Sequence, residues 1–110
     1  MSENRYVTEE SLIRFHEFLQ QEERSTGTIE KYMRDVKNFA AWIEDQSFVS
    51  SGFPCCKVTK ETAIRWKQYL LQSGRAPSTV NSMLAAVNTY FKFMCWQDLR
   101  IKAIRLQRSF

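Results

Sequence analysis

The sequence predicts an all-α fold, a bundle of four helices packed around one core. Apolar residues recur at the 3.6-residue spacing of amphipathic helices over long stretches, and no credible strand appears. Only three glycines and two prolines occur in 110 residues, so the chain has few turns. A chain of this length forms one domain and buries a core without needing disulfides or a metal ion.

The first two helices are indicated by an N-terminal capping signal and by regularly spaced apolar residues. Thr8 supplies a hydroxyl cap, and the acids that follow it suit the positive end of the helix dipole, so a helix is expected at about residues 9–22. Residues 1–8 are expected to form a flexible N-terminus. The second helix is expected from about Thr28 to Asp45, because its apolar residues follow i, i+3, i+4, i+7 spacing over five turns.

Residues 46–58 form the one long loop between the two halves of the chain. Thr59 caps the third helix, and Gly74 ends it in the left-handed position that favours glycine. The fourth helix begins at the turn containing Pro77 and is expected to end near Gln97.

The pattern changes near the end of the fourth helix. Cys95 lies within the apolar stripe, which predicts a buried and inert thiol. From Asp98 onward the periodicity weakens, and a short helix and an extended strap are both compatible with the residues.

Charge is distributed unevenly along the chain. Residues 1–56 carry six basic and ten acidic side chains, a balance of −4, and residues 57–110 carry ten basic and two acidic ones, a balance of +8. A basic half of this kind suits a polyanionic partner, although an ordinary solvated surface explains the charge equally well.

Composition also excludes several classes of protein. The N-terminus is polar and acidic, unlike a signal peptide, and no apolar run approaches the roughly 18 residues needed to span a bilayer. The three cysteines are odd in number and lack zinc spacing, which predicts a reduced, cytoplasmic protein without a metal site or other cofactor. His16 is the only histidine, and no glycine-rich phosphate loop occurs, so no catalytic residue is assigned.

One pattern occurs twice, at residues 28–43 and 79–94, with a constant offset of 51. Each copy is an amphipathic helix with a Ser/Thr-rich start. Arg24 and Arg75 precede the two starts at the same offset. Two helix N-termini, each preceded by an arginine, are suited to bind phosphates.

The polar faces of the two copies differ. The second helix presents Lys31 and Arg34 on one basic stripe, whereas the fourth presents small neutral residues that permit close approach by another helix or a DNA groove. Capping by Thr28 and by the hydroxyls of the fourth helix, together with a solvated basic face, explains the same residues without DNA. The polar residues at the start of the fourth helix are Ser78, Thr79, Asn81 and Ser82.

These segments resemble one known family. STGTIEKYMRDVKNFAAWI, VTKETAIRWKQYLL and PSTVNSMLAAVNTYFKF are similar, in this order and spacing, to the N-terminal core-binding or SAM-like domain of phage integrases and other tyrosine recombinases. The resemblance covers about residues 9–97 and implies an orthogonal four-helix bundle. The family's Asn-Pro after the fourth helix is absent here, since the chain continues Asp98–Leu99–Arg100.

The resemblance implies a DNA clamp that acts in DNA integration and recombination. The second and fourth helices would face double-stranded DNA, and Lys31 would be the first choice for a base contact because it lies one turn into its helix. The nine candidate contact residues lie on these helices or just before them: Arg24, Thr28, Lys31, Arg34, Arg75, Ser78, Thr79, Asn81 and Ser82. Residues 98–110 would begin the linker to a catalytic domain absent from this chain, so the chain itself would not be an enzyme. The isolated domain would be a monomer, and the parent enzyme would act as a tetramer on DNA.

A second hypothesis remains open from the residues alone. The small neutral face of the fourth helix would also suit an all-helical protein-interaction adaptor without any role at DNA.

Overall fold

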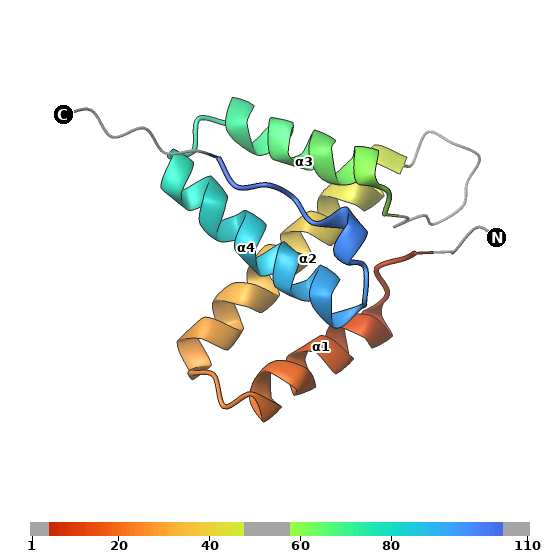
Figure 1. Ribbon diagram of the computed structural model, residues 1–110, viewed down its shortest axis with the longest axis vertical. Helices are drawn as coiled ribbons and strands as arrows, with labels where there is room; N and C mark the ends of the chain where they lie inside the picture. Colours follow the sequence, from red (N-terminus) through yellow and green to blue (C-terminus); the bar gives the residue numbers. More distant parts are fainter. Residues whose placement is uncertain (1–4, 48–57, 105–110) are drawn as a thin grey trace.

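A computed structural model of the chain describes residues 5–47 and 58–104, and these form four α-helices and one 3-10 turn (Figure 1). The predicted all-α class is confirmed. Most of the expected loop at 46–58, including Cys55 and Cys56, lies outside the described residues. The elements are α1 (Glu9–Gln21), α2 (Thr26–Ser47), α3 (Lys60–Gln72), α4 (Pro77–Phe93) and η1 (Gln97–Leu99).

The predicted caps of α1 and α3 are confirmed. Thr8 Oγ1 accepts the N–H of Ser11 at 3.0 Å, and the Ser11 hydroxyl lies 3.0 Å from the N–H of Thr8, which completes a reciprocal capping box. Thr59 Oγ1 accepts the N–H of Thr62 at 3.1 Å. Gly74, with φ +84°, follows the end of α3 in the left-handed conformation that glycine adopts without strain.

Helix α2 begins two residues earlier than expected, at Thr26. The Ser25 hydroxyl accepts the N–H of Thr28 at 3.2 Å, and the Ser25 carbonyl accepts the N–H of Ile29 at 3.0 Å. Ser25 is therefore the cap, and the assignment of capping to Thr28 is wrong. Ser25 and Thr28 both carry a hydroxyl suited to capping, and capping by Ser25 adds nearly a turn of helix.

Helix α4 ends at Phe93, well before the expected Gln97, and this overturns the prediction for Cys95. Cys95 is exposed and has φ +62°. Its N–H donates to the Lys92 carbonyl at 3.1 Å, and the N–H of Trp96 donates to the Phe91 carbonyl at 2.7 Å. These two bonds form a Schellman motif, which reverses the chain and brings the indole of Trp96 back onto the core.

The core is rich in aromatic rings contributed by all four helices. Phe39 of α2 packs edge-on against Trp66 of α3, with ring centroids 4.8 Å apart. Phe15 of α1 meets Tyr90 of α4 at 5.3 Å, also edge-on. The Tyr90 hydroxyl lies 2.9 Å from the Ser11 hydroxyl, so its polar end is hydrogen-bonded within the core.

Helices α2 and α4 cross at the centre of the bundle (Figure 1). At the crossing, the Lys31 ammonium forms an ion pair with Asp35 one turn along α2, and it donates to the Ser82 carbonyl of α4 at 3.3 Å. The Asp35 side chain is only 6% exposed, and that of Lys31 is 32% exposed. A buried carboxylate thus requires a cation that is itself bonded to the other helix.

The last residues before α1, within the segment expected to form a flexible N-terminus, lie against the rest of the domain. Val7 is buried, and the Arg5 carbonyl accepts the N–H of Val58 at 2.7 Å. Arg5 Nη1 donates to Asp98 Oδ2 at 2.7 Å, and this hydrogen bond lowers the pKa of Asp98 below its ordinary value of 3.8. The pair therefore contributes to stability above that ordinary pKa, and the contribution is lost as pH falls through the lowered one. Residues 1–4 lie outside the described residues.

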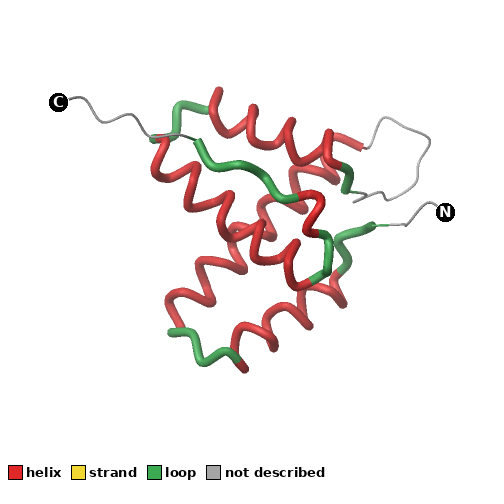
Figure 2. The backbone as a smooth tube through the Cα atoms, viewed as in Figure 1, coloured by secondary structure: helices red, strands yellow, loops and turns green. Residues whose placement is uncertain are grey.

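Beyond η1, residues 100–104 form an extended strap that runs antiparallel to α4 (Figure 2). Asn88 bonds both the N–H and the carbonyl of Ile101, each at 2.8 Å. Asn81 bonds the N–H and the carbonyl of Ile104 in the same way, at 2.6 and 2.9 Å. The short helix and the strap that the sequence left open are both present, one after the other.

The ion pair at the crossing generates a prediction. Lys31→Met leaves the buried Asp35 carboxylate without a counter-charge. We expect it to lower the free energy of unfolding in urea by about 2–3 kcal/mol, since Lys31 is partly exposed and the pair is not fully desolvated.

The matched control is Arg65→Met, which removes the basic partner of the i, i+4 pair between Arg65 and Glu61 on α3. Both side chains of that pair are more than two-thirds exposed, at 68% and 69%. Its unfolding free energy should stay within about 0.5 kcal/mol of the parent chain. Equal, small effects of the two substitutions would contradict the proposed role of Lys31.

The two asparagines should act locally on the strap. Asn88→Ala should speed hydrogen exchange of the Ile101 amide much more than that of Ile104, and Asn81→Ala should do the reverse. Each loss of two neutral hydrogen bonds should cost about 1–2 kcal/mol. Exchange followed by NMR provides the measurement, and equal acceleration of both amides by either variant would show that the strap is not held residue by residue.

Cys95 occupies a position that favours glycine. Cys95→Gly should raise the free energy of unfolding by about 0.5–1 kcal/mol, because the left-handed conformation strains a residue with a Cβ. Cys95→Ala, the control, keeps the Cβ and should have little effect in urea denaturation under reducing conditions. A destabilised Cys95→Gly variant would mean that the thiol makes a contact that outweighs the strain.

Candidate nucleic-acid interface

An open hollow of about 450 Å³ lies where the side of α2 meets the start of α4. Six of the nine candidate DNA-contact residues line it, together with three residues that were not among the candidates. The six are Lys31, Arg34, Arg75, Ser78, Thr79 and Ser82, and the other three are Asp35, Asn38 and Met83.

The α2 side of the hollow carries residues one helical turn apart. Lys31 is held by Asp35 and by the Ser82 carbonyl, so its charge is largely compensated. Arg34 and Asn38, separated by four residues, share a face and are both exposed. The base contact expected of Lys31 is therefore better suited to Arg34, whose guanidinium is not committed to a carboxylate among the described residues.

The α4 side is a helix N-terminus without a side-chain cap. Ala76 holds the cap position and Pro77 follows it, so the capping expected of Ser78 and Thr79 is wrong. The two residues fall at the second and third helical positions, where backbone N–H groups have no partner within the helix. Both residues are exposed, and both line the hollow together with Arg34.

Arg75 completes the hollow from the turn before α4. It is exposed, and its Nη1 donates to the Ser73 hydroxyl at 2.6 Å. That bond orients the side chain without neutralising it. With Lys31, Arg34 and Arg75 opposed by Asp35 alone, the lining side chains carry a net charge of +2. Two arginines beside an uncapped helix N-terminus can bind an anion such as a phosphate.

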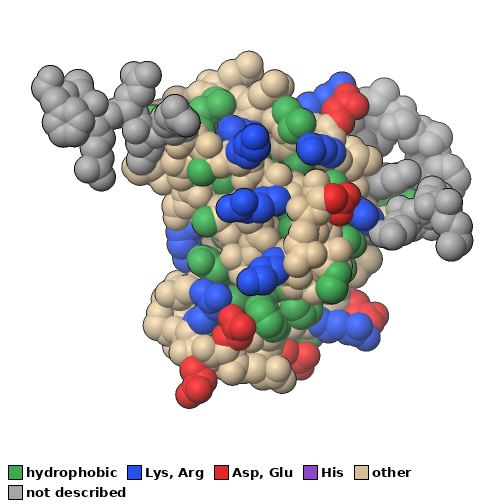
Figure 3. Space-filling view, viewed as in Figure 1, with side chains coloured by type: hydrophobic (Ala, Val, Ile, Leu, Met, Phe, Trp, Pro, Cys, Tyr) green, Lys and Arg blue, Asp and Glu red, His purple; other side chains and the backbone are tan. Residues whose placement is uncertain are grey.

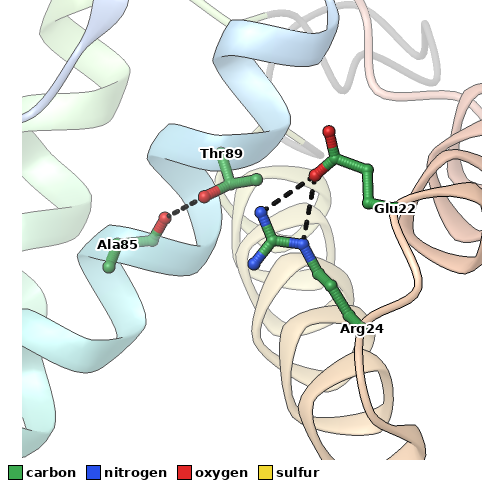
Figure 4. A network of polar contacts seen from close by, with 4 residues as sticks. All are labelled: Glu22, Arg24, Ala85 and Thr89. Atoms are coloured by element: carbon green, nitrogen blue, oxygen red, sulfur yellow. Dashed lines mark hydrogen bonds and ion pairs between the residues drawn. The ribbon is translucent and has the colours of Figure 1, made fainter.

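Arg24 and Thr28 lie away from the hollow and make local contacts. The Arg24 guanidinium donates twice to Glu22, at 3.0 and 3.3 Å (Figure 4). It also lies 5.4 Å from the ring centroid of Tyr32. The Thr28 hydroxyl accepts from that of Ser25 at 2.8 Å. The symmetry of the two arginines in sequence is therefore not reproduced in space, because Arg24 is ion-paired with Glu22, whereas Arg75 has no ion pair within residues 5–47 and 58–104.

Asn81 also lies outside the hollow, because its amide is used by the strap. Sequence reasoning missed the part played by Asp35, although its position four residues after Lys31 was a usable signal. Asn38 lies on the same stripe of α2 as Arg34, so its presence in the hollow follows from the helical period.

A larger groove of about 850 Å³ separates α1 from α2. Its lining is mixed: Leu12, Ile13 and Met33 are apolar, and charged residues lie around them with His16. No group of metal-ligating side chains is found among the described residues. In the same residues, no helix combines the length and the apolar character needed to cross a bilayer.

Comparison with known proteins agrees with the sequence motifs. The family model described as "Phage integrase, N-terminal SAM-like domain" matches residues 12–98. A relative described as "Putative tyrosine recombinase TTE1313", from Caldanaerobacter subterraneus subsp. tengcongensis, is 28% identical over 81 residues, which make up 73% of this chain and 26% of that protein. This chain thus corresponds to about a quarter of the relative's length. No solved structure matches the chain.

The resemblance seen in the motifs is confirmed: with its four-helix fold and a family match over residues 12–98, this chain belongs to the phage integrase N-terminal SAM-like domain family.

Proposed function

We propose that this chain is the DNA-binding domain of a site-specific tyrosine recombinase, and that it clamps the core site during DNA integration and recombination. The observation that carries the proposal is the hollow between α2 and α4. Arg34 and Arg75 reach it from different elements, and the uncapped start of α4 opens into it.

The shape of α4 supports a role in a DNA groove. Ser78, Ala85 and Thr89 are small, and Ala85 and Ser78 are exposed on the helix surface. The Thr89 hydroxyl donates to the Ala85 carbonyl of its own helix at 2.9 Å, so it adds little bulk (Figure 4). Such a surface lets the helix backbone approach the base edges of a major groove about 12 Å wide. The arginines at its side would then contact phosphates and set the orientation.

In this proposal Lys31 positions the two helices of the interface and makes no direct contact with DNA. It fixes α2 against α4, and so it fixes the separation of Arg34 from Ser78 and Thr79. The direct contacts come from Arg34, Arg75, Ser78, Thr79 and Ser82.

The parent protein would carry a second, catalytic domain after this one. The relative named above is much longer than this chain, and this agrees with such an arrangement. The domain would bind DNA as a monomer when isolated, and the parent enzyme would assemble as a tetramer on two DNA sites. The activity itself would belong to the catalytic domain.

The proposal predicts salt-dependent DNA binding through the two arginines of the hollow. Arg34→Gln with Arg75→Gln should weaken binding to a labelled mixed-sequence duplex about tenfold at low salt, and should reduce the slope of log K against log salt by about 1.8, at about 0.9 for each phosphate contact. Fluorescence anisotropy at several salt concentrations measures both quantities.

The control double variant, Arg14→Gln with Arg65→Gln, removes the same charge from two exposed i, i+4 pairs on α1 and α3. It should retain the parent slope. Equal salt slopes in the two double variants would refute the placement of DNA phosphates in the hollow. Absence of DNA binding by the parent chain would favour a protein-binding adaptor. Charge reversal at Lys31 is avoided as a test, since it would place two carboxylates together at the helix crossing.

A further inference from the structure

The strap presents basic side chains in a fixed direction. Its hydrogen bonds with α4 and α3 use the backbone atoms of the strap: Asn81 and Asn88 hold Ile104 and Ile101, and Lys67 Nζ donates to the Lys102 carbonyl at 2.6 Å. Ile101 is buried, so the alternating side chains Arg100 and Lys102 are turned outward and exposed.

These cations form part of a larger basic surface. Lys92 of α4 lies beside Arg100 around a shallow hollow that Asn88 and Thr89 also line. Asp98, two residues before Arg100, already has a partner, because its carboxylate pairs with Arg5. Figure 3 shows Lys and Arg side chains down the middle of the face that carries α3, the strap and α4, with acidic side chains toward its edges and lower end.

Helix geometry places this surface on the other side of the exposed stripe of α4 from the arginine-lined hollow. Ser78 and Ala85 are exposed, are spaced by seven residues and form that stripe. The residues three positions after them, Asn81 and Asn88, turn to the strap. Ser82, four positions after Ser78, lines the hollow against α2. The stripe therefore has cations along both of its sides.

A helix in a major groove has a phosphate backbone on each side. If the stripe of α4 faces the groove, Arg34 and Arg75 meet one strand. We propose that the strap cations Arg100 and Lys102, together with Lys92, bind the phosphates of the opposite strand, so that α4 is held between two lines of basic residues. This inference rests on the proposed DNA-binding function and adds a second contact surface to it.

The test uses the 110-residue chain and the same labelled duplex, about three helical turns long so that both strands extend past the domain. Arg100→Gln with Lys102→Gln should leave the strap docked, because the strap is held through its backbone. NMR shifts of the Ile101 and Ile104 amides will check this. The salt slope should fall by about 1.8 and affinity should drop about tenfold at low salt, as for two lost phosphate contacts.

The Arg14→Gln, Arg65→Gln variant again controls for net charge, and the outcomes separate the two proposals. If the hollow variant loses affinity while the strap variant matches the control, the second surface is refuted and DNA binding by the hollow stands. A loss in the strap variant alone supports the strap surface and refutes the hollow. If the parent chain does not bind the duplex, both proposals fail.

Discussion

The crossing of α2 over α4 is the constraint on which the rest of the structure depends. Its apolar side supplies the centre of the core, and its polar side is closed by Lys31, which joins the Asp35 carboxylate to the Ser82 carbonyl. A buried carboxylate is costly unless a cation accompanies it, and here the same cation is bonded to the opposite helix. The same ammonium group therefore neutralises Asp35 and holds α2 against α4. It also determines which residues share the hollow, since Arg34 and Ser78 come from different helices.

The strap closes the opposite side of α4 by a related device. Two asparagines one heptad apart each satisfy the N–H and carbonyl of a single strap residue, much as a neighbouring strand would. An extended segment without a sheet partner would otherwise leave these backbone groups unpaired beside an apolar surface. Because the two asparagines bond backbone atoms of the strap, its outward side chains remain available to contact a ligand. This is how the segment after the fourth helix becomes both a structural element and a candidate contact surface.

Several features were predictable from local sequence because their causes are local. Thr8 and Thr59 cap their helices through bonds to residues three positions on, and Gly74 ends α3 because glycine tolerates a positive φ. The errors arose where two residues competed for one role. Ser25 caps α2 in place of Thr28, and the chain turns at Cys95 rather than continuing its stripe. The turn brings Trp96 onto the core, and the gain from burying an indole outweighs the strain at a residue with a Cβ.

The sequence by itself determined the all-α class, the order of the helices, most of their apolar faces and the family, because the 3.6-residue period and the caps depend on near neighbours. Only the tertiary structure decided which polar residues are available for binding. Lys31, Asn81 and Arg24 have the same chemical character as the residues that line the hollow. A carboxylate, a strap and a neighbouring glutamate occupy them instead. Lys31 and Asn81 also bond backbone groups 51 and 23 residues away in the sequence, and helical periodicity carries no information about partners this distant.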